Sequence, residues 1–568
     1  MKHPSWLILI LFFLVPYTYA ENPSDEELKN TIQSHFPEIV FEQNTRHAGD
    51  LSALLPIHNE GITLPLNRFI LGILYNIILD KNPNKHKTAR VRYFGKNHSI
   101  CSEEKAFWEK RDQYAAQALE KVLNRPINTK TTPRIALISS GGGFRAMISF
   151  AGFANKLNQF GILDAVHMIG GVSGSTWLIY PWMASKKSFT EFYPEFVERV
   201  LNGILGVEAK EFAHNITTFS GSIAEAFLRR LAFHEIPTSI DLYGLMLGLH
   251  LFDTKSKKNY AWTSLSSIKP HVTSGTVPLP IGTAIVQHEG QKSDEVEFNP
   301  FEVINYGLDA GCPGFGFGRD FYNGKSLSRH PAPALGYLMG ICGSAFSQKV
   351  KTYIPTIKDF LKPKPFFVPL FDLIEKSCLG ESRLFPAFVR NYTRGMNASP
   401  DKRARFHAYI DAGIDYDAPM LPTLNPERNI DIIILVESGS NVNWSGSLEV
   451  LARVAKANNR PFPHIDYERA RSNPFSVFDD GPDSPAPIVF YVPLVKNPSY
   501  SEEFDPWPLI YPYQNNFLHM MNFFYTREQY NLLAGLFETA ASQMYQNLTQ
   551  KLLEAIDKKE RGIRPQNG

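Results

Sequence analysis

The stretch from residue 134 to residue 184 constrains the fold more than any other part of this 568-residue chain. It opens with RIALISS, a short apolar run bounded by Thr-Thr-Pro and three glycines, which predicts a buried strand. FRAMISFAGFANKLNQFG follows with apolar residues at helical spacing and ends at Gly161, a helix terminator. AVHMIGGV predicts a second strand, and TWLIYPWMA predicts a second helix despite Pro181. This order predicts an α/β sheet whose two loops lie at the carboxyl ends of strands, where ligands bind.

The first of these loops, SGGG at residues 140–143, is suited to holding an anion. Its successive backbone N–H groups carry no β-carbons and lie just before a helix, whose positive end faces them. A phosphate cradle is one interpretation, but the loop lacks the Gly-Lys-Ser/Thr of a P-loop. It also fails the GxGxxG pattern, because Arg145 and Ala146 follow. An oxyanion hole fits better, since it needs only preorganised donors.

The second loop is GVSGS, residues 171–175, which resembles the Gly-x-Ser-x-Gly nucleophile elbow except for its last residue. The strained elbow needs small side chains two positions before and two after the nucleophile, and Gly171, Gly174 and Ser175 meet that need. The pentapeptide alone is also compatible with an ordinary turn of small residues. Its position after the triple-glycine loop favours Ser173 as a catalytic nucleophile.

A serine nucleophile needs a base, and the chain offers two kinds. His464 or His519 would suit a triad in which histidine comes late in the chain, but neither has distinctive neighbours. Asp411 ends a short apolar stretch in FHAYIDAGIDYDAPMLPTL and is followed by Ala412 and Gly413. A carboxylate at the end of a buried strand, beside small residues, is well placed to take a proton directly from a serine.

Several segments together resemble one known family. SGGGFRAM (140–147), GVSGSTW (171–177) and DAG followed by APMLP (411–422) are similar to the catalytic domain of cytosolic phospholipase A2 and to the secreted phospholipase B or lysophospholipase enzymes, a branch of the patatin-like clan. PLPIGTAIVQ (278–287), EVEFNPFEV (295–303) and LGYLMGICGSAFS (335–347) match the same branch, in the family's order. The elbow ending in serine is the form of this branch, whereas patatins proper end it in glycine.

The resemblance implies a fold and a role for each site residue. The expected fold is a patatin-like three-layer α/β/α sandwich with a central mixed sheet and a cap region. Ser173 is the implied nucleophile and Asp411 its base, a dyad without histidine. Gly142 and Gly143 are the implied oxyanion donors, and Arg145 resembles the family arginine that binds the substrate phosphate; an arginine paired with a carboxylate is the alternative. No metal and no other cofactor is implied. Ala412, in the middle of DAG, is as small as the family pattern requires.

The chain divides into an N-terminal region and a long catalytic region. Lys2 and the apolar stretch that follows predict a signal peptide, residues 1–20, and hence secretion; a membrane anchor is the alternative. Residues 21–130 are predicted to be an α-rich lead-in and residues 131–560 the phospholipase catalytic domain, with a cap inserted at about 180–410. Four cysteines in a secreted chain can form two disulfides, in any of three connectivities.

The expected partners are lipids. A net charge of +2 without a long basic block gives no reason to invoke nucleic acid. The resemblance implies a phospholipid or lysophospholipid substrate and a lipid interface, for which the Pro- and Phe-rich segment 360–374 is a candidate; a core-packing loop is the alternative. The expected function is a secreted serine phospholipase or lysophospholipase. An acyltransferase or other glycerolipid esterase at the same site and a non-catalytic lipid-binding protein remain as alternatives.

Overall fold

The structure is a computed structural model that describes residues 76–563, with gaps at 77, 96–98, 202–224, 288–292, 346–385, 398–401, 440–445, 511–515 and 521. Of residues 225–237 it describes 225, 226, 229, 230, 233 and 235. The predicted signal peptide and the segment 360–374 lie outside the described residues.

A mixed 12-stranded sheet runs through the molecule in the order β1-β7-β6-β5-β4-β3-β2-β12-β14-β13, with β11 pairing β4 and β10 pairing β11. Its parallel part consists of β4 (Leu279–Val286), β3 (Val166–Val172), β2 (Ile135–Ser139), β12 (Ile432–Glu437) and β14 (Ile488–Pro493). The antiparallel strands are β5 (Asp294–Phe298), β6 (Glu302–Asn305), β7 (Ala310–Pro313), β1 (Arg92–Tyr93), β11 (Phe406–Asp411), β10 (Ala387–Arg390) and β13 (Ser476–Phe478). A separate hairpin joins β8 (Phe321–Tyr322) to β9 (Lys325–Ser326).

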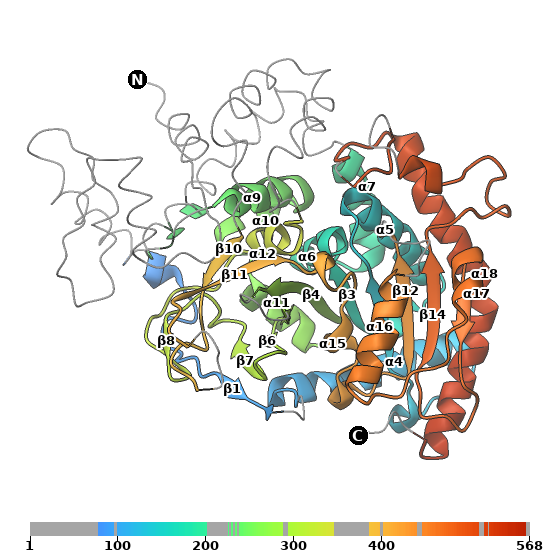
Figure 1. The fold of residues 1–568 in the computed structure, drawn as a ribbon, viewed down its shortest axis with the longest axis horizontal. Coiled ribbons are helices and arrows are strands. Elements are labelled where there is room, and N and C mark those ends of the chain that lie inside the picture. Colours follow the sequence, from blue (N-terminus) through green and yellow to red (C-terminus); the bar gives the residue numbers. More distant parts are fainter. Residues whose placement is uncertain are drawn as a thin grey trace, which may run out of the picture.

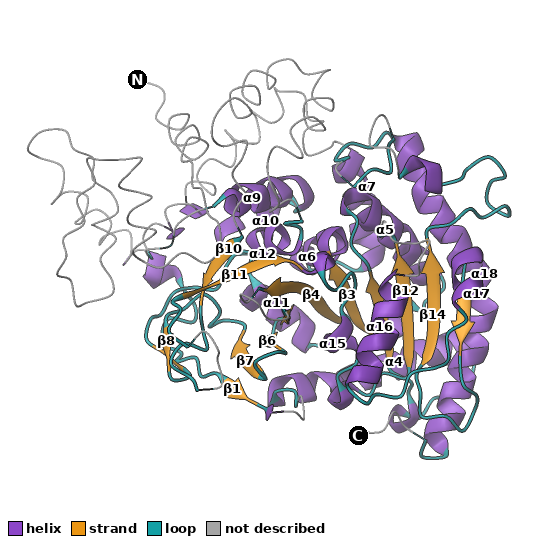
Figure 2. Ribbon diagram, viewed as in Figure 1, coloured by secondary structure: helices purple, strands orange, loops and turns teal. Residues whose placement is uncertain are grey.

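The parallel strands are apolar runs because helices cover both faces of the sheet. Every residue of β2, β3, β4, β12 and β14 is buried, as expected for a parallel sheet without a solvated face. Figure 2 shows the strands enclosed between helices. The three-layer fold with a central mixed sheet, predicted from the sequence, is therefore confirmed.

Helices lie between many of the strands in sequence, and one long helix follows the last strand, β14. They are α4 (Ser102–Leu123), α5 (Gly143–Gln159), α6 (Thr176–Ser185), α7 (Phe189–Leu201), α9 (Ser239–Leu251), α10 (Thr254–Lys258), α11 (Leu265–Thr273), α12 (Leu335–Cys342), α15 (Met420–Thr423), α16 (Gly446–Ala457), α17 (Tyr467–Ser472) and α18 (Arg527–Glu560). The long α18 lies beside β14 at one side of the molecule and packs against α5 (Figure 1). β2, α5, β3 and α6 occur in the predicted order.

The stretch 180–410 does more than cover the sheet. It supplies β4, β5, β6, β7 and β10 and most of β11, so a large part of the sheet comes from residues between nucleophile and base. β1, from the N-terminal region, pairs with β7 in the same sheet. The boundaries of a cap stay a prediction.

The expectation of two disulfides is wrong. Cys101, Cys312 and Cys342 are free thiols, and Cys378 lies outside the described residues. They are separated because Cys101 precedes α4, Cys312 lies in β7 and Cys342 ends α12. Within the described part of the chain, every helix is too short or too polar to cross a bilayer.

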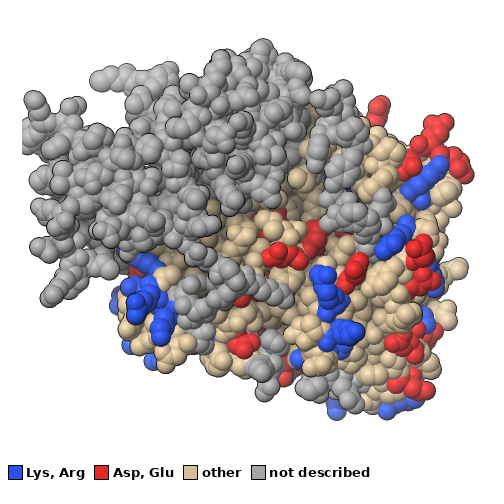
Figure 3. Space-filling model, in the orientation of Figure 1, with Lys and Arg blue, Asp and Glu red and all other residues tan. Residues whose placement is uncertain are grey.

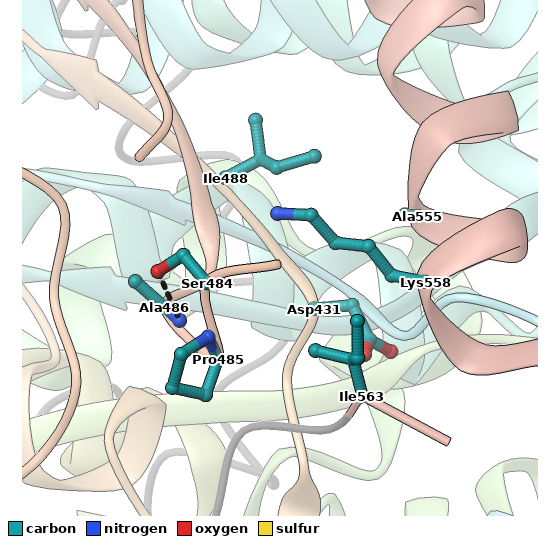
Figure 4. Close-up of a pocket in the computed structure, with 8 residues that line it drawn as sticks. All are labelled: Asp431, Ser484, Pro485, Ala486, Ile488, Ala555, Lys558 and Ile563. Atoms are coloured by element: carbon teal, nitrogen blue, oxygen red, sulfur yellow. Dashed lines mark hydrogen bonds between the residues drawn. The ribbon is translucent and has the colours of Figure 1, made fainter. Parts of the chain in front are cut away.

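The amino edge of the parallel strands carries paired charges rather than an open site. Figure 4 shows a pocket there, between the start of β12 and the C-terminal end of α18, lined by Asp431, Ser484, Pro485, Ala486, Ile488, Ala555, Lys558 and Ile563. Its volume of about 10 Å³ leaves room for about one water molecule. Asp431, which lines the pocket, accepts a 2.6 Å hydrogen bond from Lys559. We therefore interpret the charges here as contacts that hold β12 and α18 together. On the right-hand part of the face in Figure 3, acidic and basic side chains are interspersed.

Candidate active site

Ser173 has the strained backbone of a nucleophile elbow. It follows β3 directly, begins the turn into α6 and has a φ of 51°, a left-handed conformation that few residues other than glycine adopt. Its side chain is nearly buried, and the Thr176 hydroxyl donates 2.6 Å to the Ser173 carbonyl. Strain at a strand-to-helix turn is characteristic of a site where one side chain must be presented in a fixed direction.

The small residues of the elbow are there because backbones approach closely. A β-carbon on Gly174 would collide with the carbonyl of Gly143 in the glycine loop, and one on Gly171 would lie 2.8 Å from the Ser175 β-carbon. Ser175, which stands where the usual elbow has glycine, donates 2.6 Å to the Ser140 carbonyl. The serine therefore fastens the elbow to the glycine loop, a link that a glycine side chain would not provide.

The glycine loop presents free N–H groups beside the elbow. Gly142 and Gly143 have φ values of 136° and 64° and form the start of α5. A β-carbon on Gly142 would lie 2.7 Å from the Ser438 carbonyl, and one on Gly143 would collide with the Met520 carbonyl. Among the described residues, no turn, loop or side-chain acceptor takes their N–H groups, as expected for the first turn of a helix. These donors are placed to receive an oxyanion, and their role stays a prediction.

Asp411 lies at the end of β11, across β4 from the elbow strand. Its N–H donates 3.1 Å to the Ser344 hydroxyl, and its Oδ1 accepts 2.8 Å from the Gly413 N–H. Its Oδ2 is buried, and among the described residues no donor has both the distance and the angle of a hydrogen bond to it. The Ser173 side chain is close enough to act as a hydrogen-bonding group on this carboxyl. Nucleophile and predicted base are therefore brought together.

The environment of Asp411 makes it a stronger base than an ordinary aspartate. Burial raises the pKa of Asp411 to about 7, although hydrogen bonds from Gly413, Ser173 and Ala345 act in the opposite direction. The side chain is only 1% exposed. A carboxyl that ionises near neutral pH matches the requirement for a general base whose pKa lies close to the working pH.

The two histidines considered as alternatives are less suitable. His464 is exposed, and its backbone N–H donates to Asp480. His519 lies near the glycine loop, in the segment that also contains Met520. Burial and the charge of Arg145 lower the pKa of His519 to about 4, which makes it a weak proton acceptor at neutral pH. Asp411 is the better candidate on both position and basicity.

Arg145 lies in the first turn of α5, as predicted, but it points into the protein. Its Nε donates 2.8 Å to the Ser438 carbonyl and its Nη1 donates 2.5 Å to the Leu518 carbonyl, and the residue is 1% exposed. In this structure the guanidinium ties the glycine loop to the segments after β12 and before α18. Its contact with a substrate phosphate stays a prediction.

Aromatic side chains gather beside the site. Phe144 follows the glycine loop and makes edge contacts with Trp177 and Phe523, with ring centroids 5.8 and 5.7 Å apart. Tyr243 contacts both Trp177 and Phe523, and the Asp411 carboxylate acts on its pKa, so it lies close to the base. Phe523 and Tyr243 are only partly buried. Because Phe144 and Trp177 are buried, Tyr243 and Phe523 are the members of this group that offer apolar surface.

Sequence reasoning missed two carboxyls near the site. Asp417 follows Asp411 by six residues and accepts the Gly141 N–H at 2.9 Å. Glu437 ends β12 and is almost fully buried. Asp417 stands in the segment that identified Asp411, but nothing in the sequence connects it with Gly141 or with Glu437, because they come from separate strands.

Comparison with known proteins finds phospholipases that are similar in sequence and in fold. The mouse protein cytosolic phospholipase A2 zeta is 26% identical over 471 residues, which cover 70% of this chain and 53% of the mouse protein. Human GIVD cytosolic phospholipase A2 has a similar fold, with a TM-score of 0.67, 20% identity, and coverage of 82% of this chain and 66% of the human chain. A structure of that human protein with methyl gamma-linolenyl fluorophosphonate has a TM-score of 0.62 at 21% identity, with coverage of 81% and 65%.

This chain therefore spans about half the length of the mouse relative and slightly under two thirds of the human chain. The family model described as lysophospholipase catalytic domain matches residues 135–473. That match begins at β2, includes the glycine loop, the elbow and Asp411, and extends beyond β12. With more than half of the chain matched, this protein belongs to the lysophospholipase catalytic domain family, which is a family of enzymes.

Proposed function

We propose that this protein hydrolyses fatty acyl esters of glycerophospholipids or lysophospholipids, with Ser173 as nucleophile and Asp411 as its general base. The observation that carries the proposal is the pairing of a strained, nearly buried serine with an aspartate whose pKa is raised to about 7. A serine hydroxyl is a poor nucleophile until a base removes its proton as it attacks. The ionised Asp411 fills that role without an intervening histidine.

The first half of the reaction forms an acyl-serine. The Ser173 oxygen attacks the carbonyl carbon of the ester while its proton passes to Asp411, and the carbonyl electron pair moves onto the oxygen. The N–H groups of Gly142 and Gly143 bind this oxyanion. Collapse of the tetrahedral intermediate breaks the ester C–O bond, and the leaving lysolipid or glycerophosphodiester oxygen takes the proton from Asp411.

The second half releases the fatty acid. Water attacks the acyl-serine, Asp411 accepts the water proton, and the same glycine N–H groups bind the second oxyanion. Collapse returns the proton to Ser173 and frees the fatty acid. Both halves use the same base and the same oxyanion site, because each passes through a tetrahedral intermediate on the same carbonyl carbon.

The aromatic cluster of Phe144, Trp177, Tyr243 and Phe523 supports an apolar acyl chain as the group that enters the site. An acyl chain gains about 0.8 kcal/mol for each buried methylene, so a partly exposed aromatic surface beside the nucleophile favours a fatty ester over a small polar one. Arg145 as the phosphate-binding residue remains part of the proposal, since a positive group near the site would orient the head group.

We further propose that the protein acts at a lipid interface and that it is secreted. The basis for secretion is the signal-like sequence of residues 1–20. The two named relatives are described as cytosolic phospholipases, so the location of this chain needs its own test. Expression of the full chain in a secretory host, followed by mass spectrometry of the N-terminus in medium and cell fractions, would decide it. An intact residue 1 in the cell fraction alone would contradict secretion.

The test of the reaction is fatty-acid release from phosphatidylcholine and from lysophosphatidylcholine, with EDTA present. Ser173→Ala and Asp411→Ala are expected to abolish release from both lipids, and the ratio of the two wild-type rates gives the substrate preference. If Asp411→Ala keeps near-full activity while His464→Ala or His519→Ala loses it, the aspartate is not the base. Transfer of the acyl group to an added lysolipid, without free fatty acid, would indicate an acyltransferase. The absence of any turnover would favour a lipid-binding protein.

A further inference from the structure

The carboxyl of Asp417 connects the loops that follow three strands of the sheet. Its Oδ1 accepts the Gly141 N–H at 2.9 Å, in the glycine loop after β2. A β-carbon on Gly413, in the loop after β11, would lie 3.3 Å from the same oxygen, and one on Gly439, after β12, would fall within 3.0 Å of Oδ2. One side chain therefore packs against the oxyanion loop, the loop of the base and a third loop.

Glu437 faces the other oxygen of Asp417. Its Oε1 accepts the Gly439 N–H at 2.9 Å and its Oε2 accepts the Ser447 N–H at 3.1 Å. A β-carbon on Gly439 would lie within 3.0 Å of both Glu437 Oε1 and Asp417 Oδ2, so these two oxygens are neighbours. The negative charge of Glu437 this close to Asp417 favours the neutral form of Asp417.

We infer that Asp417 is a positioning residue, a neutral acceptor packed beside Glu437, and that it fixes Gly141 so that the next two glycines can receive the oxyanion. This inference rests on the proposed function, because it assigns a role within the same reaction. Asp417 acts through the glycine loop and does not itself contact the reacting atoms.

The surroundings of Asp417 favour its neutral form. Burial and the negative charge of Glu437 raise the pKa of Asp417 well above its ordinary value, and Asp411 acts in the same direction. The Gly141 N–H and the guanidinium of Arg145 act in the opposite direction but do not reverse the shift. From β14, the neutral Tyr491 side chain also faces the pair.

Neutrality matters because Asp417 is close to the base. A β-carbon on Gly413 would lie 3.2 Å from Asp411 Oδ1 and 3.3 Å from Asp417 Oδ1, which limits the separation of these two oxygens. At such a separation, a charge on Asp417 would raise the pKa of Asp411 by about one unit or more. It would also oppose the negative charge that forms on the substrate oxygen. A neutral acceptor holds Gly141 without either effect.

The test compares three single variants of the full chain: Asp417→Asn, Asp417→Ala and, as the control, Asp415→Asn, which changes an exposed carboxyl two residues away. Asparagine keeps a neutral acceptor for Gly141, so the acid midpoint of the pH–rate profile should stay within about 0.3 unit of wild type. Alanine removes the acceptor, so kcat should fall about 10- to 100-fold with little change in KM. The control should match wild type.

Two results would overturn the inference. A shift of the acid midpoint to lower pH by about one unit in Asp417→Asn would mean that Asp417 is an anion in the wild type. Full kcat in Asp417→Ala would mean that Gly141 needs no anchor. Circular dichroism identifies a variant that fails to fold; if Asp417→Ala does so, the asparagine midpoint alone decides.

A second readout separates this inference from the proposed function. The rate at which an alkyl fluorophosphonate labels Ser173 depends on the base and the oxyanion loop but requires no lipid hydrolysis. If wild type labels but releases no fatty acid, the proposed substrate is wrong, and the same comparison of variants is made on labelling rates. If wild type neither labels nor hydrolyses, both the proposed function and the inference fail.

Discussion

Two aspartates at opposite edges of the sheet differ in the way expected of a structural carboxyl and of the proposed base. Asp112, in α4, lies at the amino edge and binds Arg134 at 2.8 Å and His167 at 3.2 Å. Burial raises its pKa, but the hydrogen bonds from His167 and Arg134 outweigh burial and hold the pKa well below its usual range. No cation among the described residues bonds to Asp411, at the carboxyl edge, and its pKa is raised to about 7.

In many serine hydrolases an Asp–His pair activates the serine, but the Asp–His pair of this protein lies elsewhere. The Asp112–His167 pair has the composition of a catalytic dyad, yet His167 is buried at the start of β3, six residues before Ser173 and about 20 Å away along the strand. Burial lowers the pKa of His167 to about 4, so it stays neutral and bridges Asp112 to the Ile135 N–H. The Asp–His pair of this protein lies far from Ser173, and the proposed base is instead a carboxyl close to that strained serine.

The largest expected contrast between the two aspartates is in activity. Asp411→Asn removes the base but keeps the size and the Gly413 contact, so kcat for fatty-acid release should fall about 10³-fold. Asp112→Asn changes a carboxyl far from Ser173 and should leave kcat within about threefold at a temperature where the variant is folded. Initial rates on lysophosphatidylcholine measure both, and similar losses in the two variants would refute the distinction.

The second contrast is in the free energy of unfolding. The ionised Asp411 carboxylate is expected to destabilise the folded state. Its folded-state pKa lies above the unfolded value near 4, so the native state loses stability as the pH rises from about 4 to about 7. Above pH 7 the full penalty applies, with an upper bound of about 4 kcal/mol. Asp411→Asn should therefore be more stable than wild type at pH 8 and equally stable at pH 4. Chemical denaturation at both pH values measures this, and a destabilised variant at pH 8 would show that the ionised carboxyl is favourable.

A smaller effect of opposite sign is expected for Asp112. Its pKa is lowered in the folded state, so its stabilisation is present above pH 4 and is lost as the pH falls through the lowered value. Asp112→Asn should destabilise the protein by about 2 kcal/mol at pH 7, because Arg134 and His167 lose their partner. The same denaturation experiment checks it, with Glu449→Gln, an exposed carboxyl on α16, as the control. An unchanged denaturation midpoint for Asp112→Asn would mean that its contacts with Arg134 and His167 contribute nothing to stability.

The smallest effect is expected for the exposed histidine. His464→Ala should change neither the rate nor its pH dependence, because the group of His464 that bonds Asp480 is its backbone N–H and not its ring. Steady-state kinetics on the same lysophospholipid decide this. A loss of more than about tenfold would restore the triad hypothesis.

The part of the site that lies in short local segments was predictable from the sequence. The glycine loop and the elbow each sit between an apolar strand and a helix, and those signals place Ser173, Gly142 and Gly143 correctly next to one another. Asp411 was found because it ends an apolar strand, and because its segment resembles a known family. The resemblance supplied its role as base.

The contacts between distant segments were not predictable. Asp417 and Glu437 meet only because β11 and β12 end at the same edge of the folded sheet, and no local pattern records that. The direction of Arg145 was missed for a similar reason, since the Ser438 and Leu518 carbonyls that bind it come from much later in the chain. The cysteine count suggested disulfides, but the fold keeps three of the thiols on separate elements.

The most direct test of the dyad is the pH dependence of Ser173 labelling by an alkyl fluorophosphonate, compared among wild type, Asp411→Asn and His519→Ala. We predict that the wild-type rate rises with pH to a plateau with a midpoint near 7, that His519→Ala keeps this midpoint, and that Asp411→Asn labels slowly at every pH. A rate that persists in Asp411→Asn and disappears in His519→Ala would show that histidine, and not Asp411, activates the serine.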